Sequence, residues 1–341
     1  MNTVELNTFS AAPRHRGVNG NGASESASNA ATRERPCVED RRLQIVWSLD
    51  RSSDIGRALL AATRRLREAE VESAQLDAAV LLSTVLGVNR AWLYAHPTRQ
   101  LSEHEIAKYE ELVRRRMCHE PVAYLVGYKP FYGLDITVDN RVLIPRPETE
   151  ILVERALGHA QVLIREGQRP VIADIGTGSA AIAVALAINA REATVYATDV
   201  SAACMEVSEK NVWRYGVGEQ VHLVPGSLMD NLPEPVDIVV ANLPYVATTD
   251  LPTLPPQVRN WEPVLALDGG PDGCDVIRKL LRQLASPQGQ ARLKPGAVIF
   301  LEIGADQGPR VRAAVNETLP HCGCSVLVDY AGLDRVVVIT T

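Results

Sequence analysis

The stretch Val236-Asp237-Ile238-Val239-Val240-Ala241-Asn242-Leu243-Pro244-Tyr245 is an apolar run that stops abruptly at a polar residue, a proline and an aromatic ring. Its length, too short for a helix, and its β-branched residues predict a buried strand of a parallel sheet. Ligands of open α/β sheets bind at the carboxyl ends of such strands. We therefore expect Asn242 to Tyr245 to lie at the ligand-binding edge of a sheet.

These four residues have the chemistry to hold a planar group that carries an NH2. The side-chain oxygen of Asn242 and a nearby backbone carbonyl can accept both hydrogens, while the Tyr245 ring offers a flat face. Pro244 pushes Leu243 toward an extended backbone, which fixes the direction of the Leu243 carbonyl. An ordinary strand-to-loop exit is the competing interpretation, because Asn and Pro are common in turns.

Composition bounds the class of protein. The chain has 341 residues, of which 46% are hydrophobic and 22% charged, and this predicts a globular protein with two domains. It has no apolar run of bilayer length and no secretory signal pattern, so we expect a cytoplasmic protein without membrane contact. A formal net charge of −6 gives no reason to expect DNA binding. The cysteines lack metal-ligand spacing and are interpreted as reduced thiols without a metal site; they are Cys37, Cys118, Cys204, Cys274, Cys322 and Cys324.

Four segments of the chain differ in their patterns. Residues 1–42 show no apolar periodicity and are expected to be a disordered tail. Residues 43–127 carry apolar residues at helical spacing, which predicts a small helical domain. Residues 128–147 begin with the alternation of a β-hairpin and end in a proline-rich linker. Residues 148–341 alternate strands with helices and form the larger domain.

Within the helical segment, individual residues make further predictions. Leu60 and Leu76 belong to the apolar spacing, and Ser102 with Glu105 forms a capping box at a helix start. Basic and acidic residues are equal in number between positions 50 and 141, so no basic stripe for nucleic acid is present. The run Arg114-Arg115-Arg116 is interpreted as a solvated helix end.

A glycine-rich turn follows the strand predicted at 170–175. In Asp174-Ile-Gly-Thr-Gly-Ser-Ala180, the glycines allow a ligand to approach the backbone, and the following helix start offers unpaired N–H groups. The next predicted strand ends at Asp199, where a carboxylate can hold the two hydroxyls of a ribose. The pair favours a cofactor that contains adenosine.

The last two strands, predicted at 325–330 and 335–339, are joined by a short turn and must be antiparallel. The earlier strands are separated by helices, which predicts a parallel sheet covered on both faces. A parallel sheet that ends in an antiparallel pair is not the plain dinucleotide-binding pattern. We therefore predict an α/β fold with the Rossmann-like sheet of class I S-adenosylmethionine-dependent methyltransferases and a small helical N-terminal domain.

At these motifs the chain resembles the bacterial protein-(glutamine-N5) methyltransferases of peptide chain release factors, called PrmC or HemK. The resemblance covers about Leu76 to the C-terminus and rests on six motifs in the family's order. They are Glu120-Pro-Val-Ala-Tyr-Leu-Val-Gly127, Ile144-Pro-Arg-Pro-Glu-Thr-Glu150, Asp174-Ile-Gly-Thr-Gly-Ser179, Asn242-Leu-Pro-Tyr245, Leu267-Asp-Gly-Gly270 with Asp272-Gly273, and Leu301-Glu-Ile-Gly304 with Gln307.

The resemblance implies methyl transfer from S-adenosylmethionine to the glutamine amide nitrogen in the Gly-Gly-Gln loop of a release factor, which the helical domain would grip. The residues implied for the glutamine are Asn242, Leu243, Pro244 and Tyr245. Those implied for the cofactor are Gly176, Thr177, Gly178, Ser179, Ala180, Asp199 and Asn242. From spacing alone, Glu148 or Thr149 either faces the ligand or belongs to a structural linker.

Three positions depart from the family's pattern. Leu243 replaces the usual first proline of the substrate motif, so Asn242 loses its pre-proline restriction. Ala180 replaces a glycine, a change that is tolerable where the residue is already helical. Ser227 and Leu228 stand where many relatives have an acid and an aromatic residue beside the adenine, so neither is assigned an adenine contact.

Three other functions remain open from the sequence. The same cradle serves adenine N6 or another nucleic-acid amine on a base stacked against Tyr245. A non-catalytic adenosine-binding partner of translation would not need Asn242. A related enzyme would methylate a glutamine of a ribosomal protein, and the sequence separates this substrate poorly from a release factor.

Overall fold

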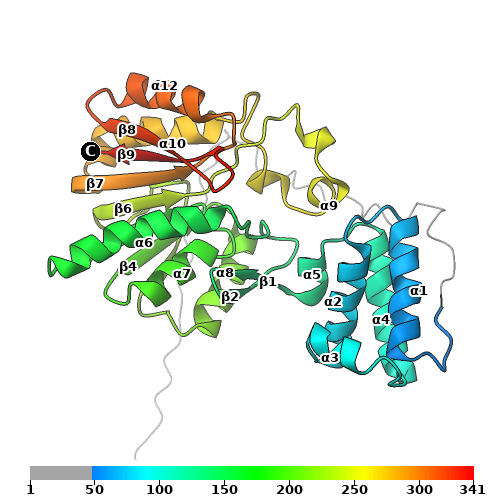
Figure 1. Cartoon of the computed structure of the whole chain (residues 1–341). Helices are drawn as coiled ribbons and strands as arrows, with labels where there is room; N and C mark the ends of the chain where they lie inside the picture. The colour runs from blue at the N-terminus through cyan, green and yellow to red at the C-terminus, as the bar shows by residue number, and fades with distance from the viewer. Residues whose placement is uncertain (1–47) are drawn as a thin grey trace, which may run out of the picture.

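The computed structural model describes residues 48–341, which form a helical part and an α/β part joined by a small hairpin (Figure 1). The predicted disordered tail at 1–42 and the start of the helical domain at 43 lie outside the described residues. In the described part of the chain, no helix has the length and apolar character needed to cross a membrane.

The helical part has a single core beneath five helices. Tyr109 is fully buried there, and its hydroxyl donates to the Ala78 carbonyl at 2.9 Å. The predicted capping box of Ser102 and Glu105 is confirmed, and Gly87 ends a helix in the left-handed conformation. The helices are α1 (Ile55–Glu68), α2 (Ala74–Leu86), α3 (Arg90–Ala95), α4 (Glu103–Met117) and α5 (Val122–Val126).

Three residues of these helices differ in exposure from what their sequence pattern suggests. Leu60 and Leu76 are 75% and 48% exposed, because a stripe of apolar residues at three-to-four spacing is wider than the contact a small core offers. Arg116 is only 4% exposed, and its Nε donates to Asp77 Oδ2 on α2 at 2.7 Å. A charged side chain is buried when it finds such a partner, and this partner lies 39 residues away in the sequence.

The predicted β-hairpin is present between the two parts. Strands β1 (Tyr128–Phe131) and β2 (Leu134–Thr137) pair antiparallel around Tyr132 and Gly133, both of which have positive φ. The Asn211 side chain binds the Thr137 backbone twice, accepting from its N–H at 2.8 Å and donating to its carbonyl at 2.9 Å. The hairpin is therefore tied to the α/β part rather than hanging free.

The α/β part contains a seven-stranded sheet in the order β5-β4-β3-β6-β7-β9-β8. The first five strands in that order are parallel, and β9 is antiparallel to both of its neighbours, which confirms the predicted antiparallel pair at the chain's end. The strands are β3 (Val171–Ile175), β4 (Thr194–Asp199), β5 (Val221–Pro225), β6 (Val236–Ala241), β7 (Leu293–Glu302), β8 (Gly323–Val328) and β9 (Asp334–Thr340).

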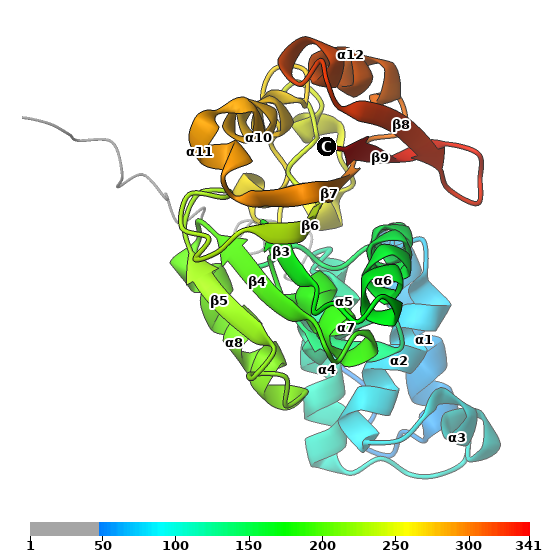
Figure 2. The same ribbon diagram turned by 90° about the vertical axis from the view of Figure 1, so that its left-hand side faces the viewer.

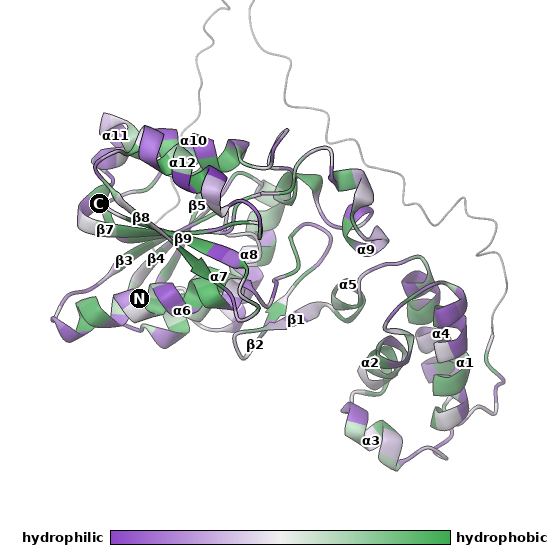
Figure 3. Ribbon diagram, turned by 45° about the horizontal axis from the view of Figure 1, so that its top comes forward, coloured by the Kyte–Doolittle hydropathy of each residue, from purple (hydrophilic) through white to green (hydrophobic). Residues whose placement is uncertain are grey.

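Helices cover both faces of this sheet, as predicted (Figure 2). One face carries α6 (Thr149–Arg165), α7 (Ala181–Asn189) and α8 (Ala202–Arg214), and the other carries α10 (Asp275–Ala285) and α12 (Gly308–Thr318). Short α9 (Pro256–Arg259) and α11 (Pro287–Gln290) lie in connections. Most residues of the central strands β3 and β6 are hydrophobic and buried (Figure 3), because a parallel strand covered on both faces has no solvent side.

Four of the six cysteines follow the prediction. Cys204, Cys274, Cys322 and Cys324 are free thiols. Cys118 is disulfide-bonded, so the prediction of a reduced thiol is wrong there, because spacing in the sequence does not reveal which sulfurs the fold brings together. Cys37 lies outside the described residues. Within residues 48–341, no group of three or more His, Cys, Asp or Glu side chains is arranged to hold a metal ion.

Candidate active site

A cavity of about 400 Å³ opens at the carboxyl edge of the sheet, where β3, β4 and β6 end. Its size is that of a small-molecule site, and its place is the one that open α/β sheets use for ligands. Predicted site residues that line it are Thr149, Gly176, Thr177, Gly178, Ser179, Asp199, Asn242, Leu243 and Pro244. Ala180, Tyr245 and Glu148 are not among its lining residues.

The glycine turn after β3 is held in place by its neighbouring strand. The N–H groups of Gly176 and Thr177 both donate to the Thr198 carbonyl of β4, at 2.9 and 2.8 Å. Gly176 has a φ of 74°, and a Cβ on it would lie 3.2 Å from Leu243 Cδ2. The positive φ favours glycine here, and a Cβ would also press against the Leu243 side chain at the end of β6.

Asp174 supports this turn from within the core. It is fully buried, and its Oδ2 accepts from the Thr177 hydroxyl at 2.6 Å and from the Ala183 N–H at 3.2 Å. Its Oδ1 has no hydrogen-bond partner among the described residues. Burial raises the pKa of Asp174 to about 7, because the hydrogen bonds only partly offset the loss of solvent around the charged form.

Ala180 does not have the conformation expected of it. The residue precedes α7 with a φ of 60° and a ψ of 25°, which is left-handed, so the condition under which an alanine is tolerable here, a residue already in the helix, is not met. Helix α7 begins one residue later, and the chain needs a left-handed residue to enter it from the glycine turn. An alanine tolerates this conformation less easily than the family's glycine because of its Cβ.

Asp199, the last residue of β4, is oriented by the backbone on both sides of it. Its Oδ2 accepts from the Gly178 N–H at 3.0 Å, and its Oδ1 accepts from the Ser201 N–H at 2.9 Å. Two carboxylate oxygens offer about four acceptor positions, so each can still receive a hydrogen from a ligand. The carboxylate is thus presented to the cavity with spare accepting capacity.

Asn242 follows β6 and reaches toward the first residue of α6. Its Nδ2 donates to Thr149 Oγ1 at 3.0 Å, which is the one hydrogen bond of this side chain within residues 48–341, so its Oδ1 has no donor there. The donor end of the amide is therefore occupied by the protein, and the acceptor end is available to a ligand. Of the two linker residues named from the sequence, the structure brings Thr149 to the cavity and leaves Glu148 outside its lining.

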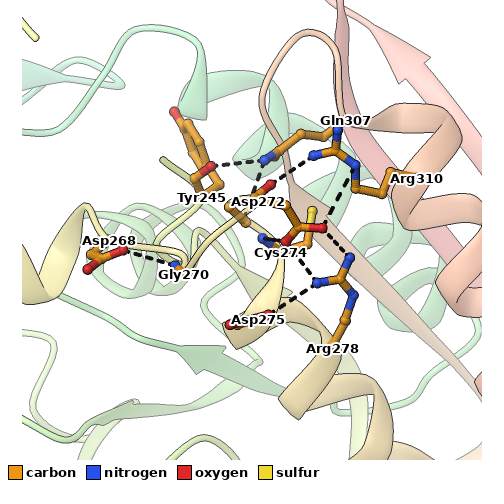
Figure 4. Close-up of polar contacts among 10 residues, drawn as sticks. Tyr245, Asp268, Gly270, Asp272, Cys274, Asp275, Arg278, Gln307 and Arg310 are labelled. Atoms are coloured by element: carbon orange, nitrogen blue, oxygen red, sulfur yellow. Dashed lines mark hydrogen bonds and ion pairs between the residues drawn. The ribbon is translucent and has the colours of Figure 1, made fainter. Parts of the chain in front are cut away.

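The Tyr245 side chain takes a different direction from its neighbours. Its hydroxyl donates to Glu302 Oε1 at 3.4 Å, and burial raises its pKa far above the usual range. Its backbone carbonyl accepts from Gln307 Nε2 at 2.9 Å (Figure 4). The ring is anchored beneath the turn, and the structure does not bring it to the lining of this cavity.

The loop that follows α9 braces the same turn, which explains why its glycines belong to the motifs. A Cβ on Gly269 would lie 2.7 Å from the Pro244 carbonyl oxygen, so only a glycine permits this approach. Asp272 caps the loop, accepting from Arg278 Nη2 at 2.5 Å, and that guanidinium lowers the pKa of Asp272 to about 2. Figure 4 shows Asp272 together with Arg278 beside the Tyr245 turn.

Several residues at this site were not assigned a role from the sequence. Phe131, Ser227, Leu228 and Lys279 line the cavity, and Lys279 Nζ donates to the Ser227 hydroxyl at 2.9 Å. Glu302, the last residue of β7, is 1% exposed next to Tyr245. Its signal in the sequence was an acid at the end of an apolar strand within the Leu301-Glu-Ile-Gly304 motif.

Two family profiles and several solved structures are similar to parts of the chain. The profile of the PrmC N-terminal domain matches residues 57–127, and that of the ribosomal protein L11 methyltransferase (PrmA) matches residues 155–254. The catalytic domain of hMettl16 in complex with MAT2A 3'UTR hairpin 6 aligns with a TM-score of 0.48 at 17% identity, covering 61% of this chain and 75% of that chain.

The strand order, the antiparallel β9 and the cavity at the carboxyl ends of β3, β4 and β6 define a class I S-adenosylmethionine-dependent methyltransferase. A release factor glutamine methyltransferase of Moorella thermoacetica is 40% identical over 279 residues, covering 82% of this chain and 95% of the relative. One of Bradyrhizobium diazoefficiens is 37% identical over 289 residues, covering 84% and 94%. The chain belongs to the release factor glutamine methyltransferase family, which confirms the predicted family.

Proposed function

We propose that this protein transfers a methyl group from S-adenosylmethionine to the side-chain amide nitrogen N5 of the glutamine in the Gly-Gly-Gln loop of peptide chain release factors. Membership of the family points to this substrate. The observation that carries the assignment to a site is Asn242, whose NH2 is held by Thr149 while its Oδ1 remains available at the cavity. An acceptor is what a substrate amide NH2 needs.

The residues of the cavity fit S-adenosylmethionine. The Asp199 carboxylate, held by two backbone N–H groups, has free acceptor positions for the two ribose hydroxyls. The turn from Gly176 to Ser179 leaves its backbone accessible to the amino-acid end of the cofactor. Ala180 lies behind this turn and supports its conformation. When bound, the cofactor supplies a methyl group that its sulfonium makes strongly electrophilic.

The remaining task of the protein is alignment. An amide nitrogen is a poor nucleophile, because its lone pair is delocalised into the carbonyl. Asn242 Oδ1 and the Leu243 carbonyl would each accept one hydrogen of the substrate NH2, orienting the nitrogen and stabilising the positive charge that develops on it. Pro244 restrains Leu243 in this role. Positioning of this kind contributes about 7–11 kcal/mol in favourable intramolecular reactions, so a strong general base is not required.

The division of labour along the chain follows from the same proposal. Residues 43–127 would recognise the body of the release factor, residues 128–147 would link, and residues 148–341 would perform the transfer. The similarity of residues 57–127 to the PrmC N-terminal domain supports the first assignment. The balance of acidic and basic residues in that region supports a protein partner over DNA, and a cytoplasmic location follows from a partner in translation.

A labelling experiment tests the substrate. Enzyme and labelled cofactor are incubated separately with release factor, with a Gln→Ala variant of its loop, with ribosomal proteins, and with single-stranded and double-stranded DNA. We expect label on the unmodified release factor alone. Equal label on the Gln→Ala protein would contradict the glutamine assignment. Label on DNA alone would favour the adenine alternative, and label on ribosomal proteins alone would favour a ribosomal substrate.

A further inference from the structure

A chain of polar side chains leads from the cavity into the core. It starts at Asn242, whose Nδ2 donates to Thr149 Oγ1 at 3.0 Å, and Thr149 is itself only 4% exposed. The next polar group is the Glu302 carboxyl at the end of β7, which is 1% exposed. Glu302 Oε1 accepts from the Tyr245 hydroxyl at 3.4 Å, and its Oε2 has no hydrogen-bond partner among the described residues.

The Thr149 hydroxyl has a single hydrogen, and the acceptor of this hydrogen determines which way the hydrogen bonds along these side chains run. Because Thr149 accepts from Asn242, its own hydrogen is available to a second acceptor. The Thr149 hydroxyl lowers the pKa of Glu302, which means that it favours the charged form of this carboxyl. An ionised carboxylate only accepts, so it can take the hydrogen of Thr149, which leaves the Thr149 oxygen to accept from Asn242. A protonated carboxyl can donate instead, and the whole chain can then reverse.

If these hydrogen bonds reversed their direction, Asn242 would present its NH2 group to the cavity in place of Oδ1. With Thr149 donating to Asn242 Oδ1, the amide NH2 would face the substrate. The substrate amide also presents an NH2, and two donors that face each other form no hydrogen bond and leave both groups unpaired. The protonation state of Glu302, which touches neither substrate nor cofactor, thus decides whether Asn242 offers an acceptor to the cavity.

We propose that Glu302 is a positioning residue for the transfer: through Thr149 it holds the Asn242 amide with Oδ1 toward the substrate, and through the Tyr245 hydroxyl it anchors the same turn. This inference deepens the proposed function and rests on it. The buried Oε2 of Glu302 has no hydrogen-bond partner among the described residues, so it is available to accept the Thr149 hydrogen.

The surroundings of Glu302 place its titration within the working range of an enzyme. Burial raises the pKa of Glu302 to about 7, and the nearby charge of Glu148 acts in the same direction. The hydroxyls of Thr149 and Tyr245 and the charge of Arg335 on β9 act against it. We therefore expect the turnover rate to fall as the pH decreases through about 7, because the protonated carboxyl no longer enforces the orientation of Asn242.

The test compares kcat, KM and the pH profile of wild type and Glu302→Gln with release factor as substrate, together with the affinity for S-adenosylmethionine. Loss of one oriented catalytic dipole lowers kcat by about 10²–10³-fold, and a large part of that loss is expected here. The cofactor affinity should be unchanged, and the decline in rate near pH 7 should disappear. Glu234→Gln is the matched control, since Glu234 also accepts from a tyrosine hydroxyl, that of Tyr196 at 2.7 Å, before β6 begins.

Two variants of Thr149 decide the question even where Glu302→Gln does not fold. Thr149→Val keeps the size of the side chain but has no hydroxyl, and we expect it to lose kcat as Glu302→Gln does, whereas Thr149→Ser should retain it. Wild-type kcat in Thr149→Val, or a wild-type pH profile in a folded Glu302→Gln, would overturn the inference. A wild-type enzyme that leaves the release factor unmethylated would overturn the proposed function instead.

Discussion

Asn242 owes its place in the proposed mechanism to the different surroundings of its two amide atoms. Its nitrogen is bound by Thr149, and its oxygen is left for a ligand. Asp199, at the end of neighbouring β4, accepts from the protein. Backbone N–H groups bind both of its oxygens, which orients the carboxylate and leaves its other lone pairs for a ligand. We therefore expect substitution of Asn242 to affect turnover and substitution of Asp199 to affect cofactor binding.

We expect Asn242→Ala to abolish turnover and to leave the dissociation constant for S-adenosylmethionine nearly unchanged. The variant loses the acceptor for the substrate NH2 but none of the groups around Asp199. Single-turnover methylation of release factor and calorimetric titration with the cofactor measure the two effects. Asn316→Ala, on an exposed position of α12, is the control. Turnover of Asn242→Ala within a few-fold of wild type would remove this side chain from the mechanism.

We expect Asp199→Ala to weaken binding of S-adenosylmethionine by about 1.5–3 kcal/mol, the usual contribution of a hydrogen bond to a charged group. Part of the effect comes from the Gly178 N–H, which loses its acceptor. Calorimetric titration measures the affinity, and Glu209→Ala on the exposed side of α8 serves as the control. An unchanged affinity would exclude Asp199 from the cofactor site.

At the scale of elements, Arg116 at the end of α4 connects two parts of the molecule. It binds α2 within the helical part and α9 outside it. The guanidinium binds Asp77 of α2, the Glu120 carbonyl at 3.2 Å and the Gln257 side chain of α9 at 3.1 Å. Trp261, two residues after α9, donates from its Nε1 to the Cys118 carbonyl at 3.1 Å. The segment around α9 therefore holds the end of α4 near the catalytic part.

We expect Asp77→Ala to lower the free energy of unfolding by about 3–5 kcal/mol, because it leaves a buried arginine without its counter-charge. The double variant Asp77→Ala, Arg116→Met should recover much of the loss, since the buried charge is removed as well. Arg114→Ala is the control, as Arg114 pairs with Glu111 in solvent, where such pairs contribute about 0–1 kcal/mol. Thermal unfolding followed by circular dichroism measures all three. A loss in Asp77→Ala as small as that of the control would contradict the prediction.

At the scale of the whole molecule, two buried carboxyls make stability depend on pH. The pKa values of Asp174 and Glu302 are both raised to about 7 by burial. The folded state therefore holds these protons more tightly than the unfolded chain does. Their contribution to stability is complete below the ordinary carboxyl pKa and is lost as the pH rises through about 7.

We expect Glu302→Gln to raise the melting temperature at about pH 8 and to raise it much less at about pH 5, since only the ionised carboxylate is penalised by burial. A shift from the ordinary value of 4.5 to about 7 corresponds to about 3 kcal/mol of unfolding free energy at the higher pH. Scanning calorimetry at both pH values measures the difference, and Glu234→Gln controls for removal of a carboxylate as such. An equal change at both pH values would show that Glu302 is not the titrating group.

Glu302 is expected to lower stability and to raise the turnover rate. These opposite effects explain why a carboxyl with one unpartnered oxygen is present in the core. The same substitution is expected to stabilise the fold and to slow the reaction. Active sites often retain a group that lowers stability because it holds a reacting geometry. Here the carboxylate lies behind the cavity, so its effect on the fold and its effect on Asn242 can be measured separately.

The sequence by itself determined the features that depend on residues close together in the chain. Apolar runs predicted the strand at 170–175 and the strand that starts at Val236, and period-two alternation predicted the hairpin. The capping box of Ser102 and Glu105 marked a helix start, and a short connection made β8 and β9 antiparallel. The motifs were enough to place the chain in its family. Each of these features follows from local periodicity or local hydrogen bonding, which a linear sequence displays directly.

Only the tertiary structure decided which distant side chains meet. Asn242 and Thr149 are 93 residues apart, and Arg116 and Asp77 are 39 apart. Periodicity tells which face of an element is buried but not which partner it meets there, because the partner is set by the order of strands and the packing of helices on them. For this reason the sequence showed an asparagine at the edge of a sheet, and the fold supplied the threonine and, behind it, the buried glutamate.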